Sequence, residues 1–256
     1  MLRISKRLEM IAGGVPTGSR LADIGSDHAL LPVYLAQKKQ IVKAVAGEVN
    51  LGPFQAASRQ VRDSVLDQVI DVRHGNGLEV VEVGEIDVIT IAGMGGALIA
   101  DILEAGKDKL AGVQLLILQP NVGESNVRLW LIQQDWILIN EQILEEDGKI
   151  YEILSAVPSH LSQASNDVLY RERQLADGIT VNRELLLKLG PYLLDHPQEV
   201  WFRKWESELE KLAMIVQRLA LSTLPESRIK ELEYQKEIER IKEVLACLQK
   251  DKPSYN

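Results

Sequence analysis

The feature that most constrains this chain is a regular alternation of short apolar segments with amphipathic ones between residues 20 and 134. The apolar segments have the length and β-branched content of strands, and they span 20–24, 44–48, 70–74, 86–92 and 114–118. The segments between them have helical periodicity, and they span 29–37, 52–64, 96–105 and 126–134. Strands that alternate with helices of about ten residues form parallel βαβ units with right-handed crossovers. The sequence therefore predicts an α/β domain built on a mostly parallel sheet.

A hairpin is expected to close this sheet. Residues 136–145 and 150–158 are two further strand-like segments, and the Asp147-Gly148 pair between them favours a tight turn. An antiparallel strand near one edge distinguishes this sheet from the all-parallel dinucleotide-binding fold. A short amphipathic helix over residues 1–13 is predicted before the first strand.

The rest of the chain is expected to be helical. Residues 158–165 have the composition of a linker, no strand signal follows them, and short helices are predicted at 166–176 and 181–189. Two long helices then follow, joined by a turn at 224–227 that makes them antiparallel. Their apolar seams contain Trp201, Trp205, Leu209, Leu212, Val216 and Leu219 in the first and Ile229, Leu232, Ile238, Ile241, Leu245 and Leu248 in the second.

Two domains are therefore expected. Residues 1–160 form the α/β domain, and residues 161–256 form an all-α domain with a coiled-coil hairpin. The alternative is that the C-terminal helices simply pack on the first domain. The sustained apolar seam favours a protruding helix pair.

The bulk composition limits the possible functions. The net charge of −8 argues against nucleic acid as a partner, although an acidic protein can bind RNA through a local basic face. No apolar run reaches the roughly 20 residues of a membrane helix. A single cysteine, Cys247, fits a reduced, cytoplasmic setting. His74, His160 and His196 lack metal-ligand spacing, so no metal site is expected.

The first βα loop has the residues of a cofactor site. In a doubly wound sheet the ligand lies at the carboxyl ends of the strands, and this loop directly follows the first strand. Gly25 has no Cβ and lets a bulky group approach the backbone N–H groups at a helix start. Ser26 and His28 lie beside it, and the anionic Asp23 would suit a cationic amino-acid group. The alternative is a structural turn capped by a serine or aspartate.

The next two strand ends carry further candidate cofactor residues. Glu48 ends the second strand, with Val49 after it, and its carboxylate can accept hydrogen bonds from both hydroxyls of a ribose. The third strand is followed by Gly75, Asn76 and Gly77. The amide of Asn76 can pair with an adenine edge, although an Asn-Gly pair is also typical of a simple turn.

The fourth strand ends in Gly93, Met94 and Gly95. The glycines allow close backbone approach, and the methionine can cover an adenine face. The first loop has a single glycine in place of the Gly-x-Gly-x-x-Gly motif of pyrophosphate binding. A cofactor without pyrophosphate fits this loop, so the four strand ends together favour S-adenosyl-L-methionine over a nicotinamide dinucleotide.

Four motifs resemble those of the bacterial TrmK family. They are Ser5-Lys6-Arg7-Leu8, Asp-Ile-Gly-Ser-Asp-His-Ala at 23–29, Ile-Ala-Gly-Met-Gly-Gly at 91–96, and Leu118-Gln119-Pro120-Asn121. Members of this family are S-adenosylmethionine-dependent tRNA methyltransferases that modify N1 of adenosine 22. The resemblance covers the whole chain. It implies a Rossmann-like class I methyltransferase domain followed by a helical coiled-coil domain, with tRNA as the substrate.

The chemistry of adenine N1 points to a candidate catalytic residue. The N1 lone pair is free in the neutral base, so attack on the sulfonium methyl group needs no prior deprotonation, and the first product is a cation. A carboxylate near the developing charge would stabilise it, and Asp27 lies at the mouth of the first helix. The alternative is that Asp27 only caps this helix.

Candidate substrate contacts lie in two segments. Gln119, Pro120 and Asn121 close the fifth strand and are expected to contact the target base, unless they form a plain strand-to-helix turn. Lys6 and Arg7 are expected to contact RNA phosphate, unless they belong to a solvated helix face.

Three other functions stay open on the sequence alone. They are methyl transfer to another RNA or to a small molecule, nicotinamide-dependent oxidation and reduction, and a scaffold that binds the cofactor without catalysis. The helical pair is expected to contact tRNA, although its composition suits dimerisation as well. A monomer is the expected state.

Overall fold

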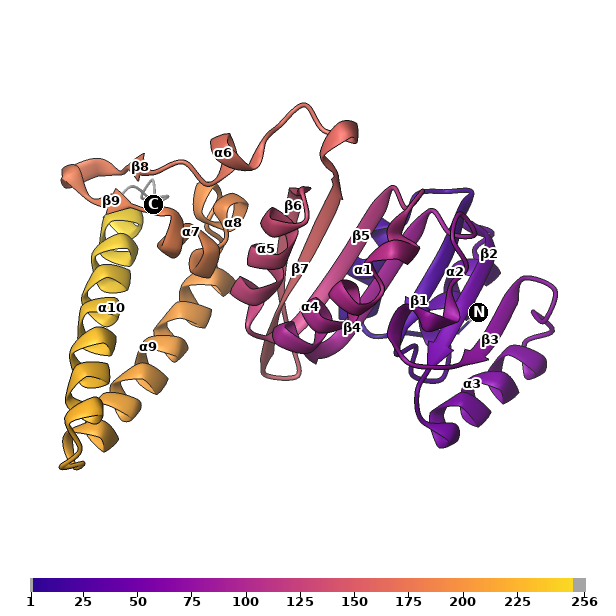
Figure 1. Ribbon diagram of the computed structural model, residues 1–256, viewed down its shortest axis with the longest axis horizontal. Coiled ribbons are helices and arrows are strands. Elements are labelled where there is room, and N and C mark those ends of the chain that lie inside the picture. The colour runs from indigo at the N-terminus through magenta and orange to yellow at the C-terminus, as the bar shows by residue number, and fades with distance from the viewer. Residues whose placement is uncertain (1, 251–256) are drawn as a thin grey trace, which may run out of the picture. The chain divides into compact units, whose positions relative to one another are not determined.

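In a computed structural model of the chain, which describes residues 2–250, the protein forms two compact units (Figure 1). The first unit ends at Val168 and the second begins at Leu169. The predicted boundary after residue 160 lies earlier than this division. The intervening segment stays with the first unit, because the Asn166 side chain donates a hydrogen bond to the Trp136 carbonyl oxygen at 3.1 Å.

The first unit is built on a seven-stranded sheet with the order β3-β2-β1-β4-β5-β7-β6. Its strands are β1 (Ser19–Ile24), β2 (Ile41–Glu48), β3 (Ile70–His74), β4 (Val88–Gly95), β5 (Leu115–Val122), β6 (Trp136–Glu146) and β7 (Lys149–Pro158). Strands β1 to β5 pair in parallel, whereas β7 runs antiparallel to both β5 and β6. The predicted mostly parallel sheet with a closing hairpin is confirmed.

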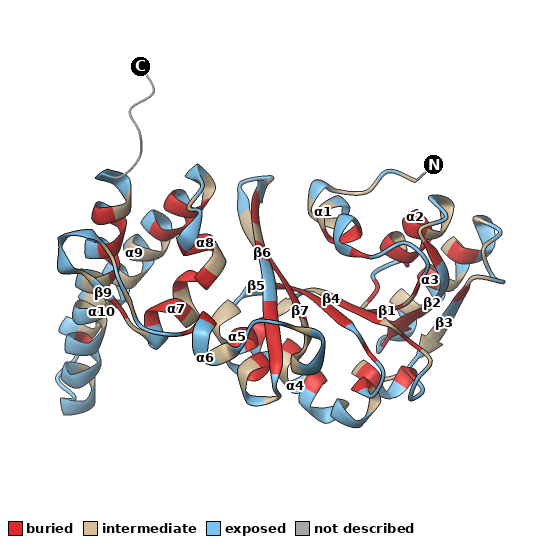
Figure 2. Cartoon of the chain, turned by 90° about the horizontal axis from the view of Figure 1, so that it is seen from above, coloured by how far each residue is buried: buried red, intermediate tan, exposed pale blue. Residues whose placement is uncertain are grey.

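Helices cover both faces of this sheet, with α1, α2 and α3 on one face and α4 and α5 on the other (Figure 2). Their bounds are α1 (Lys6–Gly14), α2 (Leu30–Gln37), α3 (Leu51–Asp63), α4 (Gly96–Ala105) and α5 (Glu124–Gln133), with short 3-10 turns at Gly77–Val80, Lys107–Leu110 and Ser159–Leu161. Helix α1 begins later than predicted because Ser5 is its N-cap, and the Ser5 hydroxyl accepts a hydrogen bond from the Leu8 N–H at 3.2 Å.

The core of the first unit lies along its central strands, which are mostly buried in Figure 2. Residues Leu21 and Ala22 of β1 and Ile89 and Ile91 of β4 have no exposed surface. Continuous burial is expected for parallel strands that have helices on both faces. The rigid strands bring the carboxyl ends of β1, β2, β4 and β5 to one edge, where the loops of the candidate site begin.

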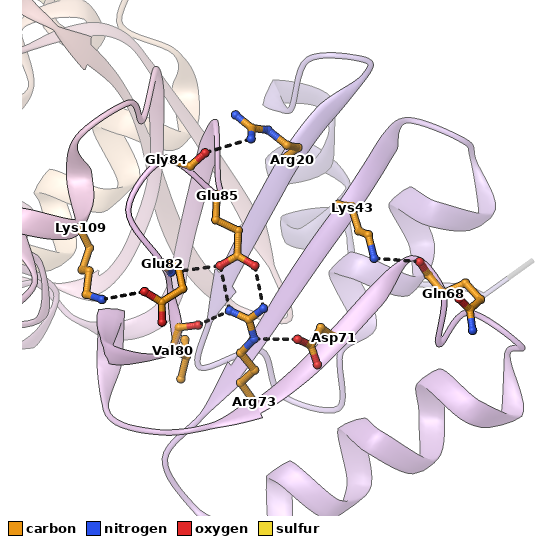
Figure 3. A network of polar contacts seen from close by, with 10 residues as sticks. All are labelled: Arg20, Lys43, Gln68, Asp71, Arg73, Val80, Glu82, Gly84, Glu85 and Lys109. Atoms are coloured by element: carbon orange, nitrogen blue, oxygen red, sulfur yellow. Dashed lines mark hydrogen bonds and ion pairs between the residues drawn. The ribbon is translucent and has the colours of Figure 1, made fainter.

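An ion-pair network ties the outer strand β3 to the loop before β4 (Figure 3). The Arg73 guanidinium donates to both carboxylate oxygens of Glu85, at 2.7 and 2.8 Å, and to the Val80 carbonyl oxygen at 2.8 Å. Asp71 accepts a fourth hydrogen bond from the guanidinium at 2.7 Å. The Arg73 guanidinium holds the pKa of the Glu85 carboxyl below its ordinary value of 4.5.

This network predicts a pH-dependent contribution to stability. A carboxyl with a lowered folded-state pKa stabilises the fold above its unfolded pKa, and this stabilisation is lost as the pH falls through the folded value. The substitution Glu85→Gln is therefore expected to cost about 1 kcal/mol at pH 7, the size of a well-formed surface pair. The difference from the unmodified protein should be smaller at pH 3, because the stabilisation is lost as the pH falls through the lowered folded-state pKa. Urea unfolding at both pH values measures it, with the exposed Glu82→Gln as a control that changes little at either. A loss of equal size at both values would contradict the prediction.

The second unit contains a small hairpin that the sequence analysis missed. Strands β8 (Arg173–Gln174) and β9 (Thr180–Val181) pair antiparallel around a 3-10 turn, Ala176–Gly178. The prediction of no strand after residue 165 is therefore wrong, and the predicted helix at 166–176 is only α6 (Asn166–Leu169). Asp177 and Gly178, which both have positive φ, form the turn. The missed signal was this Asp-Gly pair, the same kind that correctly located the β6–β7 hairpin.

Helices make up the rest of the second unit. They are α7 (Arg183–Leu189), α8 (Pro191–Asp195), α9 (Glu199–Ala220) and α10 (Pro225–Lys250). Helices α9 and α10 form the predicted antiparallel pair. The seam differs in one place, because Ile229 and Leu232 of α10 are 59% and 45% exposed while Glu231 is buried. No helix in the described part of the chain is long and apolar enough to cross a membrane.

Candidate functional site

The loop after β1 has an unusual backbone. Gly25 has φ +69°, and Asp27, His28 and Ala29 have φ values of 38°, 62° and 55°. Three consecutive non-glycine residues in the left-handed region are costly, and such strain is typical of functional sites. Strand β2 holds this loop, because the N–H groups of Gly25 and Ser26 both donate to the Gly47 carbonyl oxygen, at 2.9 and 3.2 Å.

Asp23 lies beneath this loop as a buried carboxylate. The Ser26 hydroxyl donates to one of its oxygens and the Thr90 hydroxyl to the other, each at 2.6 Å. Burial raises the pKa of Asp23, although both hydroxyl groups oppose this shift. Thr90 was missed in the sequence analysis. Its only signal was a polar side chain in the apolar strand β4, and the parallel register places it directly opposite Asp23.

Glu48 is the second buried carboxylate of the site, at the end of β2. One of its oxygens, Oε1, accepts a hydrogen bond from the Asp27 N–H at 2.6 Å. Its Oε2 has no hydrogen-bond partner among residues 2–250. Burial also raises the pKa of Glu48. Glu48 therefore holds the strained loop and keeps one oxygen for a further donor.

The residues after β3 lie next to Glu48. The Gly75 N–H donates to the Glu48 carbonyl oxygen at 3.0 Å. Asn76 is exposed and caps the 3-10 turn that begins at Gly77, where φ is +54°. Val49 is 55% exposed at this edge. The structure thus brings the predicted cofactor residues of β2 and β3 together.

The end of β4 lies against the first loop. A Cβ atom at Gly25 would be 2.1 Å from the terminal methyl group of Met94, so the methionine side chain rests directly on this glycine. Gly93 has φ +79°, and Gly95 is the N-cap of α4. Met94 was expected to cover an adenine face, and the structure places it on the Gly25 backbone.

The predicted substrate residues at the end of β5 face the Gly93 segment. Gln119 is completely buried, and its Oε1 accepts a hydrogen bond from the Gly93 N–H at 3.1 Å. Asn121 donates from its side chain to the Gly93 carbonyl oxygen at 2.8 Å. Pro120 lies between them, and its carbonyl oxygen accepts from the Gln119 amide at 2.8 Å. Gln119 is therefore not free to reach a base.

The N-terminal helix contributes Arg7 to this cluster. The Arg7 guanidinium donates to Gln119 Oε1 and lies over the Tyr151 ring, 5.3 Å from its centroid. Lys6 is exposed, and its backbone N–H donates to Glu146 at 2.6 Å. Of the two predicted phosphate contacts, Lys6 is exposed, whereas Arg7 is half-buried and bonded to Gln119.

Asp27 and His28 are the exposed residues of the first loop. Their side chains are 82% and 57% exposed, and the His28 Nε2 lies 3.7 Å from an Asp27 oxygen. The capping interpretation of Asp27 is not supported, because the N-cap of α2 is Ala29 and no side-chain hydrogen bond caps this helix within residues 2–250. The Asp27 carboxylate therefore faces solvent at the mouth of the loop.

The site as a whole combines two buried acids, an exposed acid and a glycine-lined edge. No group of three or more His, Cys, Asp or Glu side chains in the described part of the chain could hold a metal ion. Buried carboxylates at the ends of two adjacent parallel strands can accept hydrogen bonds from an amino group and from ribose hydroxyls. This arrangement suits a nucleoside cofactor with an amino-acid tail.

Comparison with known proteins gives the family. The model of the TrmK family, tRNA (adenine(22)-N(1))-methyltransferase, matches residues 21–243. A Bacillus subtilis (strain 168) tRNA (adenine(22)-N(1))-methyltransferase is 45% identical over 245 residues, which cover 95% of this chain and 98% of the relative. The crystal structure of the B. subtilis m1A22 tRNA methyltransferase TrmK has a TM-score of 0.85 at 43% identity and covers 96% of this chain and 100% of its own.

A third relative comes from Streptococcus pneumoniae and was solved in complex with S-adenosyl-L-methionine. It has a TM-score of 0.76 at 40% identity and covers 95% of this chain and 100% of its own. These matches extend over nearly the full length of this chain and of each relative, and they agree with the motifs at the four strand ends. This chain therefore belongs to the TrmK family of tRNA (adenine(22)-N(1))-methyltransferases.

Proposed function

We propose that this chain transfers a methyl group from S-adenosyl-L-methionine to N1 of adenosine 22 in tRNA. The observation that carries the proposal is the pair of buried carboxylates, Asp23 and Glu48, around the left-handed loop at Gly25. Family membership supplies the substrate, because the B. subtilis relative is named for methylation of adenine 22 in tRNA. The S. pneumoniae relative holds S-adenosyl-L-methionine.

The cofactor fits the residues present. Glu48 is a buried residue, and its Oε2 accepts no hydrogen bond from residues 2–250, which suits a ribose hydroxyl. Asp23 and the backbone at Gly25 and Ser26 would hold the methionine end, and the exposed Asn76 would face the adenine edge. When bound, S-adenosyl-L-methionine supplies an electrophilic methyl group. The flanking residues Val49, Gly75, Gly77, Met94 and His28 would line this site.

Asp27 is the proposed catalytic residue. Adenine N1 attacks with a free lone pair, so the protein needs to orient the base and to stabilise the cation that forms. The Asp27 carboxylate is exposed, lies at the mouth of the loop and is fixed through its own N–H by Glu48. A base that enters from solvent would meet this carboxylate before it reaches the buried acids.

Basic residues of the second unit would add contacts to the RNA backbone. Lys230, Lys236 and Arg240 of α10 and Lys188 of α7 line a groove of about 490 Å³, in which they slightly outnumber Glu184, Glu233 and Glu237. Phosphate attraction depends on such local charge more than on the net charge of the protein. We propose the cytoplasm as the site of action and a monomer as the active species.

The test is methylation of a tRNA transcript with isotopically labelled cofactor, followed by nucleoside analysis. The expected product is N1-methyladenosine in a transcript with adenosine at position 22, and no label in a matched transcript with guanosine there. The variant Glu48→Ala should lose binding of S-adenosylhomocysteine in calorimetry and methylation with it. Label in protein, in a small molecule or equally in both transcripts would refute the proposal.

A further inference from the structure

Arg7 is half-buried and its guanidinium bonds to Gln119 within the site cluster, although its place at the start of α1 suggested a phosphate contact. We infer that Arg7 is a positioning residue for methyl transfer, which fixes the Gly93–Met94 segment through the side chain of Gln119. The inference rests on the proposed function for its kinetic consequences. Its structural consequence, a fixed Gly93 segment, holds in the free protein and can be tested separately.

The backbone of α1 is anchored so that Arg7 points inward. The Glu146 carboxylate accepts hydrogen bonds from the N–H groups of Lys6 and Arg7, at 2.6 and 3.3 Å. A carboxylate at a helix N-terminus satisfies free N–H groups and interacts favourably with the helix dipole. The guanidinium then stacks over the Tyr151 ring, 5.3 Å from its centroid, which leaves its edge toward Gln119. Lys6, the neighbouring basic residue, is exposed.

The Arg7 guanidinium determines which way the Gln119 amide is turned. Gln119 Oε1 accepts from Arg7 and from the Gly93 N–H, while its NH₂ group donates to the Pro120 carbonyl oxygen and to Asn121 Oδ1. Guanidinium and backbone N–H groups are donors only. A rotated amide would place its NH₂ group against both of them. The Arg7 guanidinium and the Gly93 N–H, which both donate to Oε1, therefore fix the orientation of the fully buried Gln119 amide.

Gln119 and Asn121 hold Gly93 on both sides. The Gly93 N–H donates to Gln119 Oε1 at 3.1 Å, and the Gly93 carbonyl oxygen accepts from the Asn121 side chain at 2.8 Å. Met94 follows Gly93 directly, and its side chain packs on Gly25, so this segment contacts the cofactor loop. Gly93 has φ +79°, a conformation that residues other than glycine rarely adopt. The chain of contacts thus runs from Arg7 through Gln119 and Gly93 to Gly25.

A positioning role and a phosphate contact predict different kinetics. For Arg7→Met we expect the single-turnover rate at saturating tRNA and cofactor to fall about tenfold to a hundredfold, because misplaced reacting groups cost this much. The tRNA Kd and its dependence on salt should stay unchanged. Arg7→Lys keeps one donor and should recover part of the rate. Arg3→Gln, a matched loss of charge at an exposed position just before α1, should leave rate and Kd unchanged.

A second readout needs no methylation. In the free protein, Arg7→Met should speed amide hydrogen exchange at Gly93 and Met94, whereas Arg3→Gln should not. In a Gln119→Leu background, adding Arg7→Met should lower the rate no further, because both changes interrupt the same contact chain. Circular dichroism at the assay temperature establishes that each variant is folded.

Three outcomes would overturn the inference. The first is that Arg7→Met binds tRNA more weakly, with a salt slope reduced by about one and a normal saturated rate. The second is that Arg7→Met lowers the rate in the Gln119→Leu background as much as it does alone. The third is that Arg7→Met leaves the amide hydrogen exchange rate of Gly93 unchanged. Failure of the unmodified protein to methylate tRNA would refute the proposed function alone. The exchange measurement would still decide whether Arg7 fixes the Gly93 segment.

Discussion

Replacing Asp27 by asparagine is expected to lower the saturated rate of methyl transfer by about a hundredfold, the usual cost of removing one group that stabilises charge in a transition state. The affinity for S-adenosylhomocysteine should change little, because the Asp27 side chain is 82% exposed and only its backbone N–H bonds to Glu48. Asparagine suits the test, since it tolerates the φ of 38° that this position requires and removes only the charge. Single-turnover methylation and calorimetry measure the two quantities.

The matched control is Asp147→Asn. Asp147 is also an exposed aspartate with positive φ, 51°, but it lies in the β6–β7 turn. This substitution removes the same charge from the same backbone conformation and should leave the rate unchanged. If Asp27→Asn weakened cofactor binding and had a normal rate at saturation, Asp27 would be a binding residue and the proposed catalytic role would be wrong.

The sheet could be predicted because its signals are local. Runs of β-branched residues such as 86–92 are buried on both faces, and the helices between them have their own periodicity and end signals. The Asp147-Gly148 turn fixed the final hairpin. The short β8–β9 hairpin was missed because its two-residue strands carry no periodicity, so only the Asp177-Gly178 pair marked it.

The candidate site was predictable in outline and not in its contacts. Strand ends meet at one edge of a parallel sheet, so Asp23, Glu48 and Gly93 could be placed together from the order of elements alone. The hydrogen-bond partners of the site residues are set by the strand register and by segments that are distant in the sequence. Thr90 lies opposite Asp23, and Glu146 anchors the start of a helix 139 and 140 residues earlier in the chain. No local pattern reports such contacts.

A buried ion-pair cluster in the first unit predicts the largest stability effect. Arg128 on α5 has no exposed surface, and its guanidinium donates to Glu141 on β6 at 2.6 Å and to Glu152 on β7 at 2.5 Å. The register pairs Ile143 with Glu152 and Glu141 with Leu154, so both glutamates share one face of the hairpin, diagonal to each other. One cation thus joins α5 to both strands and offsets part of the charge of two carboxylates whose side chains have no exposed surface.

Arg128→Met is expected to lower the free energy of unfolding at pH 7 by about 3–5 kcal/mol, because it leaves two buried carboxylates without their cation. Urea unfolding followed by circular dichroism measures the change. The control Arg62→Met removes an exposed arginine from α3 and should cost less than about 0.5 kcal/mol. The triple variant Arg128→Met, Glu141→Gln and Glu152→Gln separates charge from packing: it should recover much of the loss, since none of these three charges remains. If the triple variant were as unstable as Arg128→Met, packing of the arginine side chain, and not neutralisation of the two glutamates, would be what Arg128 contributes.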